Sequence, residues 1–504
     1  MYTKIISSQQ MRNIENKAFN LYKINSYNLM KSAGKAVFEE IIANFGLVTN
    51  KKCTVLCGNG NNGGDGFVIA KELLKSKAKV QIIYFNEALN FTSDTTKAFS
   101  EVSDINKIFY NINSVKEIIE KSDLIVDAVY GTGYNRQLCE QEIIFFKLVN
   151  QSNAYKVAVD VPSGIVCDTG IVLSEAINCD ITVTFQFYKY CHFIFPSADF
   201  CGKVIVKDIG IPKIAWEDED LKVNLIDDIL INSLIPKRNR NSHKGSFGKA
   251  LVICGSKLMT GAAYFSVMGA LRSGIGLVTL AVPKSILTVM QEKLNEPIFL
   301  EYEEDFENII SSLQKNNVCL IGCGIGLSKT SENLVRKVIQ SSNIPLVIDA
   351  DAITIISKNE EIFNNIKAKT VLTPHIAEFS RLCNKSIEEI NIDKINTVCD
   401  FSKRKNVITV LKGAYSLIVA DNGNVYINKT GNSGLAKGGS GDVLAGIIAS
   451  FIAQGLSEES AAVCAVYYHG LAADNLAKKL SEYGMTPSDL LDELPILFKK
   501  FNGS

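Results

Sequence analysis

The sequence has no surplus of either charge, few histidines and no long apolar run, and each lack excludes a class of protein. Lys and Arg together number 53, and Asp and Glu also number 53, so the formal net charge is zero. Because nucleic-acid-binding proteins use clustered Lys and Arg to neutralise phosphates, we expect no nucleic-acid partner. The four His residues are widely separated, which argues against a His-rich transition-metal centre.

Membrane and export signals are also missing. The longest largely apolar run, residues 443–453, is much shorter than the roughly 18 residues of a membrane-spanning helix. The first residues, MYTKIISSQQ, lack the apolar segment of a secretory signal, so we predict no membrane span and a cytoplasmic location. The 13 Cys residues are dispersed and show no zinc-site spacing, so free and mostly buried thiols are expected.

Short β-branched runs alternate with helical stretches along the whole chain. This alternation is typical of parallel sheets that helices cover on both faces. Strands are predicted in the first half at 52–58, 80–85, 123–131, 156–164 and 180–187, and in the second half at 249–256, 276–283, 318–326, 345–352, 370–375 and 407–413. The pattern breaks at IPKIAWEDEDLK (211–222), which we interpret as a linker between α/β domains at 1–217 and 223–504.

A glycine-rich run, GNGNNGGDG (58–66), stands between a predicted strand and a predicted helix. Backbone N–H groups in such a loop can approach an anion at a helix N-terminus. The run formally matches the G-x-G-x-x-G motif of dinucleotide-binding folds. However, the next strand leads to Asn86 instead of the acidic residue that binds a ribose, so an ordinary NAD-dependent dehydrogenase is not indicated.

Polar residues follow three of the predicted strands in the first half. Because parallel strands end at the same edge of a sheet, we expect convergence of Asn62, Asp65, Asp127, Asp160 and Ser163. The alternative is that each Asp only caps a following helix. Oxygen ligands of this kind suit a hard monovalent or alkaline-earth cation. Asp160, within an apolar run, is the best candidate for a general acid or base.

The second half contains KGGSGD (437–442) at the start of a small-residue helix. Consecutive glycine N–H groups there can stabilise charge on a transferred phosphoryl group, and Asp442 can accept a proton from an attacking hydroxyl. The alternative is a simple N-cap Asp behind a flexible turn. Lys412 ends another strand and is a candidate for holding a nucleotide. His375, in TPHIAE (373–378), is either a substrate contact or a structural residue.

These motifs resemble two known families. The runs NGNNGGDG, VDAVYGTG and VDVPSG resemble the NAD(P)H-hydrate epimerase family. The runs HKGSFGKALVICGS, LRSGIGLVT, GCGIG, IDADA, TPHIAE, LKGAYS and GGSGDVLAG resemble the NAD(P)H-hydrate dehydratase family, a branch of the ribokinase-like fold. Their tandem order over essentially the whole chain is similar to that of bifunctional NAD(P)H-hydrate repair enzymes. The resemblance implies an N-terminal Rossmann-like three-layer domain and a C-terminal ribokinase-like α/β domain.

The resemblance also implies two activities. The first domain would interconvert the R and S epimers of hydrated NADH or NADPH, and the second would dehydrate the S form while converting ADP or ATP to AMP or ADP and phosphate. By motif, the hydrate contacts in the first domain would be Asn61, Asn62, Gly63, Gly64, Asp65, Gly131, Thr132, Gly133, Tyr134, Asn135, Arg136 and Gln137, with Asp160 catalytic. A potassium ion would be held by Asn62, Asp127 and Ser163.

In the second domain the catalytic residue implied by the resemblance is Asp442. The hydrate would also contact Ala263, Gly324 and His375. The nucleotide, with Mg²⁺, would be held by Lys412, Gly413, Ala414, Tyr415, Ser416, Gly438, Gly439, Ser440 and Gly441. We expect hydrated NADH or NADPH and ADP or ATP as ligands, and a homo-oligomer.

Two positions depart from the epimerase pattern. Tyr188-Lys189 stands where a Pro-Lys pair is usual, and Lys31 stands where an acidic residue is common. Two other functions also stay open at this point. One is a ribokinase-like kinase of a small alcohol with a regulatory N-terminal domain, which would accumulate a phosphorylated product. The other is a non-catalytic nucleotide sensor, which would bind without turnover.

Overall fold

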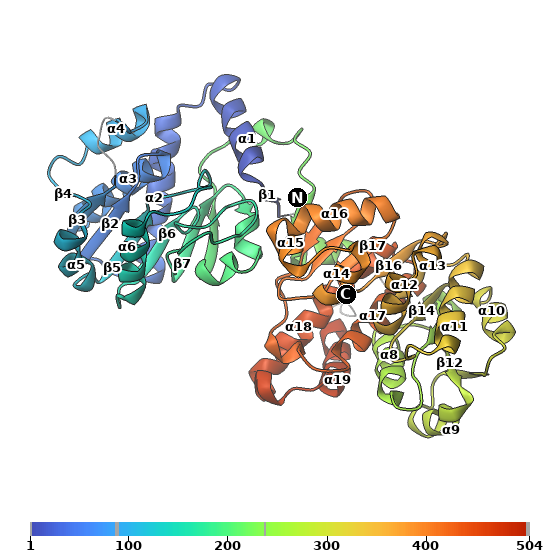
Figure 1. Cartoon of the computed structure of the whole chain (residues 1–504). Coiled ribbons are helices and arrows are strands. Elements are labelled where there is room, and N and C mark those ends of the chain that lie inside the picture. Colours follow the sequence, from blue (N-terminus) through green and yellow to red (C-terminus); the bar gives the residue numbers. More distant parts are fainter. Residues whose placement is uncertain (1–2, 86–89, 236–237, 500–504) are drawn as a thin grey trace. The chain divides into compact units, whose positions relative to one another are not determined.

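The computed structural model of the chain describes residues 3–85, 90–235 and 238–499 (Figure 1). It divides into two compact units, of which the first is Lys4–Leu221 and the second contains Thr3 and the residues from Lys222 onward. Asn86, which the dehydrogenase argument used, lies outside the described residues. Within the described residues, no helix is long and apolar enough to cross a membrane. All 13 cysteines are free, as predicted.

The first unit is a three-layer α/β structure around a seven-stranded parallel sheet in the order β4-β3-β2-β5-β6-β7-β9. The strands are β2 (Lys52–Cys57), β3 (Lys79–Tyr84), β4 (Asn106–Phe109), β5 (Leu124–Ala128), β6 (Tyr155–Val159), β7 (Ile181–Phe185) and β9 (Lys203–Lys207). A separate short ladder joins β1 (Ile5–Ile6) to β8 (Tyr188–Lys189). The strands β4 and β9 were not predicted from the sequence, because these edge strands are only partly buried and carry polar residues.

The helices of the first unit are α1 (Ser8–Asn20), α2 (Ser26–Asn44), α3 (Asn61–Lys75), α4 (Ser93–Ser100), α5 (Ile112–Glu120) and α6 (Glu140–Gln151). Side chains of α2 and α3 pack in one apolar core, and those of α5 and α6 pack in another. The segment 211–222 is not a free linker. Ile211, Ala215 and Leu221 are buried in the first unit's core, and Trp216 packs edge-on against Phe187 with ring centroids 5.1 Å apart.

The second unit has a ten-stranded mixed sheet in the order β10-β19-β18-β17-β16-β15-β14-β11-β12-β13. The strands are β10 (Val223–Leu225), β11 (Lys249–Ile253), β12 (Leu277–Pro283), β13 (Ile298–Tyr302), β14 (Val318–Ile321), β15 (Leu346–Ile348), β16 (Thr370–Leu372), β17 (Ile408–Leu411), β18 (Leu417–Val419) and β19 (Val425–Ile427). The six strands predicted from the sequence lie side by side in this sheet. The strands β10, β13, β18 and β19 were missed, and β18 is antiparallel to both of its neighbours.

Helices cover this second sheet, which confirms the α/β prediction. They are α7 (Asp228–Leu234), α8 (Thr260–Arg272), α9 (Lys284–Lys293), α10 (Glu307–Leu313), α11 (Lys329–Ser341), α12 (Ala350–Lys358), α13 (Glu360–Asn364), α14 (Ile376–Cys383), α15 (Ile387–Ile392), α16 (Lys394–Lys405), α17 (Ser440–Ala453), α18 (Glu458–Gly484) and α19 (Pro487–Phe498). Close packing of α17 on α8 depends on glycine. A Cβ on Gly446 would lie 2.2 Å from the Ser266 carbonyl oxygen, and one on Gly269 would lie 2.5 Å from that of Val443.

Candidate functional site

In the first unit, polar side chains gather where β2, β5 and β6 end, as predicted. Asp127 of β5 is fully buried. Ser163, in the loop after β6, donates from Oγ to Asp127 Oδ1 at 2.5 Å and from its backbone N–H to Oδ2 at 2.7 Å. Burial raises the pKa of Asp127 to about 6, although the hydrogen bonds from Ser163 act in the opposite direction. No cationic side chain of the described residues compensates this carboxylate.

Asn62 lies in the first turn of α3, against the loop that follows β5. A Cβ on Gly131 of that loop would lie 3.3 Å from Asn62 Cγ, so the loop backbone rests directly on this side chain. Asn62 Nδ2 is buried and has no hydrogen-bond partner in the described part of the chain. Unpaired buried amides are rare in native folds, and Nδ2, which is a donor, would be satisfied by an acceptor oxygen of a ligand.

Several glycines of the run 58–66 are required by packing. A Cβ on Gly58 would lie 1.9 Å from the Val129 carbonyl oxygen, and one on Gly63 would lie 2.0 Å from that of Gly58. These contacts let α3 lie close to the ends of β2 and β5. The expectation that residues 61–65 form a loop was wrong, because α3 already begins at Asn61. The glycines of this run therefore allow close packing at the start of α3.

Asp160 follows β6 directly and has a positive φ of 66°. Lys189 Nζ donates to Asp160 Oδ1 at 2.5 Å, and Thr184 Oγ1 donates to the same oxygen at 2.7 Å. The Lys189 side chain is fully buried, whereas Asp160 keeps 15% of its side chain exposed. Burial alone would raise the pKa of Asp160, but the charge and hydrogen bonds of Lys189 and Thr184 hold it below its ordinary value.

Three further ionisable residues surround this pair. Burial, together with the charge of Asp160, raises the pKa of Glu15 on α1 to about 7, and it raises the pKa of Asp65 well above its ordinary value. His192 Nε2 lies 3.1 Å from the Asp160 carbonyl oxygen, and burial lowers the pKa of this His to about 4. The sequence pattern did not indicate Glu15 or His192, and it singled out Lys189 only as half of an unusual pair.

The predicted hydrate loop, 131–137, is anchored by an ion pair. Arg136 donates to Glu142 at 2.7 Å and also to the hydroxyl of Tyr130. The ring of Tyr134 stacks on Tyr130, with centroids 5.0 Å apart. Asn135, Arg136 and Gln137 are exposed. Asn61 is also exposed, and its side-chain oxygen accepts a hydrogen bond from Thr92.

In the second unit, the first turn of α17 brings Asp442 to a buried polar cluster. The Sγ atom of Cys323 and one carboxylate oxygen each of Asp349 and Asp442 lie within 4.8 Å of one another. Lys412 Nζ donates to Asp349 Oδ1 at 2.9 Å. Burial, and next the charge of Asp349, raise the pKa of Asp442 to about 7, while Cys323 and Lys412 act in the opposite direction. The helix begins after Gly439, whose φ of 103° a side chain would strain.

Two of the predicted nucleotide residues, Lys412 and Gly441, meet at this cluster. Gly441 lies over Lys412, since a Cβ on Gly441 would be 3.4 Å from Lys412 Nζ. Gly413 and Ala414 are exposed, and Ser416 Oγ donates to the Gly413 carbonyl oxygen at 3.0 Å. The remaining predicted residues flank these positions in sequence, namely Tyr415, Gly438, Gly439 and Ser440.

The three predicted hydrate residues of the second unit have different surroundings. His375 is the N-cap of α14 and accepts from the Ala377 N–H through Nδ1, while its ring stays half exposed. Its backbone pairs with Lys412, so the two belong to one edge of the sheet. Gly324 has a φ of 65°, and Ala263 is fully buried in α8. His375 therefore has a structural role as a helix cap, and its half-exposed ring is also accessible to a substrate.

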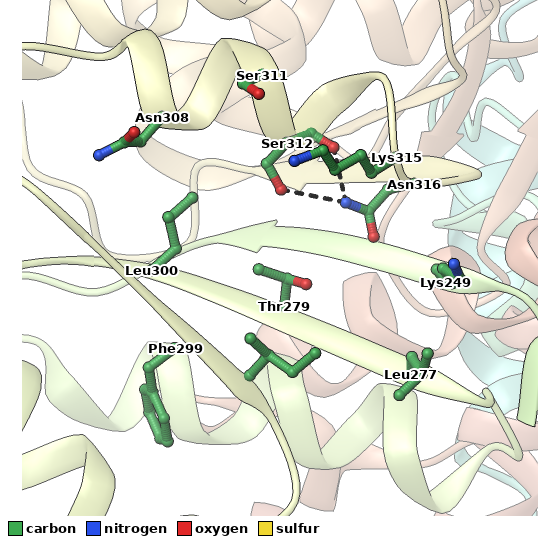
Figure 2. Close-up of a pocket in the computed structure, with 11 residues that line it drawn as sticks. Lys249, Leu277, Thr279, Phe299, Leu300, Asn308, Ser311, Ser312, Lys315 and Asn316 are labelled. Atoms are coloured by element: carbon green, nitrogen blue, oxygen red, sulfur yellow. Dashed lines mark hydrogen bonds between the residues drawn. The ribbon is translucent and has the colours of Figure 1, made fainter.

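A pocket of about 360 Å³ lies elsewhere in the second unit (Figure 2). It opens where β11, β12 and β13 begin, beside α10. Its lining combines apolar strand residues with polar residues on and after α10, namely Lys249, Leu277, Thr279, Ile298, Phe299, Leu300, Asn308, Ser311, Ser312, Lys315 and Asn316. None of the predicted site residues lines it, so this pocket is separate from the Asp442 cluster.

Comparisons with known proteins match both units. Residues 250–496 match the family model described as NAD(P)H-hydrate dehydratase, and residues 26–191 match the one described as YjeF-related protein N-terminus. The chain is 31% identical to the bifunctional NAD(P)H-hydrate repair enzyme Nnr of Moorella thermoacetica, over 98% of this chain and 96% of the relative.

Two solved structures each match about half of the chain. An ADP/ATP-dependent NAD(P)H-hydrate dehydratase from Bacillus subtilis, co-crystallised with ATP and Mg²⁺, is 26% identical and covers 54% of this chain and 96% of its own, with a TM-score of 0.48. A ribokinase-like superfamily protein from Enterococcus faecalis is 28% identical over 56% of this chain and 96% of its own, with a TM-score of 0.49. The chain belongs to the bifunctional NAD(P)H-hydrate repair enzymes, which join an epimerase unit to a dehydratase unit.

Proposed function

We propose that the Asp160–Lys189 pair moves the proton that epimerisation of the hydrate requires. The observation that carries this assignment is the fully buried Lys189 ammonium, 2.5 Å from the partly exposed Asp160 carboxylate. A carboxylate held ionised by a buried cation is prepared to accept a proton. Asn62 and the loop 131–137 would orient the hydrate beside it, together with Asn61, Gly63, Gly64 and Asp65.

A potassium ion fits the crevice of the first unit. Asp127 is a buried carboxylate with no cationic partner among the described residues, and Asn62 beside the same loop would offer its amide oxygen. Burying an uncompensated charge is costly, and a monovalent cation held by oxygen atoms of Asn62, Asp127 and Ser163 would offset that cost. When bound, the ion would supply positive charge next to the hydrate.

In the second unit, Asp442 is proposed as the general base. It would take the proton of the ring hydroxyl as that oxygen attacks the terminal phosphate of MgATP or MgADP, which is the phosphoryl donor. N–H groups at the start of α17, from Gly439 to Gly441, would stabilise the transferred phosphoryl group. Departure of phosphate from the ring carbon, with loss of a proton from the neighbouring carbon, then restores the ring double bond. The residues 412–416 would hold the nucleotide, and Ala263, Gly324 and His375 would hold the hydrate.

The test of this assignment is recovery of reduced-nicotinamide absorbance from an R and S mixture of hydrated NADH. The wild-type enzyme would be compared with Asp160→Asn and Asp442→Asn, each with ADP, with ATP and with neither. We expect full recovery with the wild type, recovery of only the S share with Asp160→Asn, and none with Asp442→Asn. Accumulation of a stable phosphorylated product would instead support a kinase. The cytoplasmic location and the homo-oligomer remain predictions.

A further inference from the structure

The carboxylate of Asp349 has a place in the second unit that helix capping does not explain. Asp349 is the N-cap of α12, yet its side chain makes no capping hydrogen bond. Instead the carboxylate, in a residue that is 1% exposed, turns toward α17. Oδ1 accepts from Lys412 Nζ at 2.9 Å, and Oδ2 accepts from Cys323 Sγ at 3.6 Å. Asp at an N-cap usually accepts a hydrogen bond from the first turn of the helix, so the absence of that bond indicates that the Asp349 side chain has a different role.

From this arrangement we infer that Asp349 is a positioning residue of the dehydratase, which fixes Lys412 in the nucleotide loop and sets the charge that faces Asp442. The inference rests on the proposed role of Asp442 as the base. The ion pair lies directly under the first turn of α17, because a Cβ on Gly441 would be 3.4 Å from Lys412 Nζ and 3.9 Å from Asp349 Oδ2. Nucleotide loop and base are thus joined by one buried carboxylate.

Groups from several elements face Asp442, and their effects on its proton affinity differ in sign. Asp349 at the end of β15 and Asp351 in α12 disfavour its ionisation, with Asp349 the stronger of the two. Lys412 after β17 and the Cys323 thiol after β14 favour its ionisation. Burial raises the pKa of Glu378 in α14, Lys412 acts in the opposite direction, and Asp349 adds to the rise. His469 of α18 is buried beside the Ser440 backbone, and burial lowers the pKa of this His to about 4, so it is neutral at pH 7.

These signs predict opposite effects for two substitutions. Asp349→Asn removes a negative charge from beside Asp442 and frees the Lys412 ammonium, so the pKa of Asp442 falls. Cys323→Ala removes the thiol that donates to Asp349 Oδ2, so less of the Asp349 charge is offset and the pKa of Asp442 rises. Cys323→Ser keeps a hydroxyl donor and serves as the conservative variant. Asp351→Asn is the matched charge control, since Asp351 accepts from the Gly326 N–H at 2.8 Å and has no bond to Lys412.

The experiment measures dehydration of S-hydrate by the full-length enzyme from pH 5 to 9 at saturating nucleotide, together with the nucleotide KM. In the wild type, activity falls as acid protonates Asp442. With Asp349→Asn we expect the acid limb to move down by about one pH unit or more, and KM to rise on the order of tenfold because Lys412 loses its anchor. Cys323→Ala moves the limb up, Cys323→Ser restores it, and Asp351→Asn shifts it less and leaves KM unchanged.

A uniform loss of rate with the limb in place for Asp349→Asn would overturn the inference, because it would indicate a purely structural role. Thermal unfolding shows whether each variant is folded. If Asp349→Asn does not fold, the variants Cys323→Ala and Cys323→Ser provide the test. An acid limb that stays in place in both variants would contradict the proposal. An absent acid limb in the wild type, or full activity of Asp442→Asn, would instead contradict the general-base assignment itself.

Discussion

Lys189 Nζ lies 2.5 Å from Asp160 Oδ1, and the lysine side chain is fully buried. Its other hydrogen bonds go to Thr184 Oγ1 at 2.8 Å and to the Phe185 carbonyl oxygen at 3.0 Å. Asp160 is the only one of these partners that carries a charge. The ion pair therefore keeps the carboxylate ionised, which makes the site sensitive to loss of either partner.

Replacement of Lys189 by Met is predicted to abolish epimerisation while dehydration of S-hydrate continues. The expected loss is at least about 100-fold, because Asp160 would be left buried without its cation and would bind a proton. The measurement is conversion of pure R-hydrate, followed through the dehydratase. Lys207→Met is a suitable control, since Lys207 pairs with Glu40 in the same unit at 2.9 Å. Unchanged R-hydrate conversion by Lys189→Met would contradict the assignment.

The change Asp442→Asn is predicted to reduce dehydration by about 100-fold to 10,000-fold with nucleotide binding retained. The amide keeps the size of the side chain but cannot accept the hydroxyl proton. Rates of S-hydrate dehydration and calorimetric nucleotide affinity would separate the two effects. Asp492→Asn serves for comparison, because that residue is exposed and makes only a 3.3 Å contact with Arg272. Loss of nucleotide affinity equal to the loss of rate would argue for a binding role instead.

Removal of potassium is predicted to weaken epimerisation and lower the unfolding temperature of the first unit. A cation beside Asp127 compensates a buried charge, and a ligand that binds only the folded state stabilises it by mass action. The measurement compares KCl with N-methylglucamine chloride at equal ionic strength, by R-hydrate conversion and by calorimetry. In Asp127→Asn both effects of potassium should disappear. A potassium effect that persists in this variant would place the ion elsewhere.

Two glycines of the run 58–66 offer a matched test of packing. Gly58→Ala is predicted to destabilise the first unit by more than about 2 kcal/mol, because its Cβ would lie 1.9 Å from the Val129 carbonyl oxygen. Gly60→Ala should cost less than about 1 kcal/mol, since a Cβ there meets nothing within 4 Å and the residue has a negative φ. Urea unfolding of the two variants gives the comparison. Equal stabilities would show that the backbone shifts freely at Gly58.

The positions of the central strands along the chain and of the motifs that follow them could be predicted from the sequence alone. Strands such as β5 and β6 are buried on both faces, so they appear as continuous apolar runs. Parallel strands end at one edge, which is why Asp127 and Ser163 could be expected to meet. Edge strands such as β4 and β9 could not be recognised, because one side faces solvent and their residues are mixed.

The local sequence thus determined the α/β alternation, the glycine-rich helix starts and the family to which the chain belongs. Tertiary structure alone decided which partner each charged group meets. Lys189 reaches Asp160 because β8 pairs with β1, and Asp349 leaves its capping position for Lys412, which lies 63 residues further along the chain. Such pairings depend on burial and on contacts between distant segments. No periodicity within one segment encodes them, whereas a strand or a helix is encoded by its own neighbours.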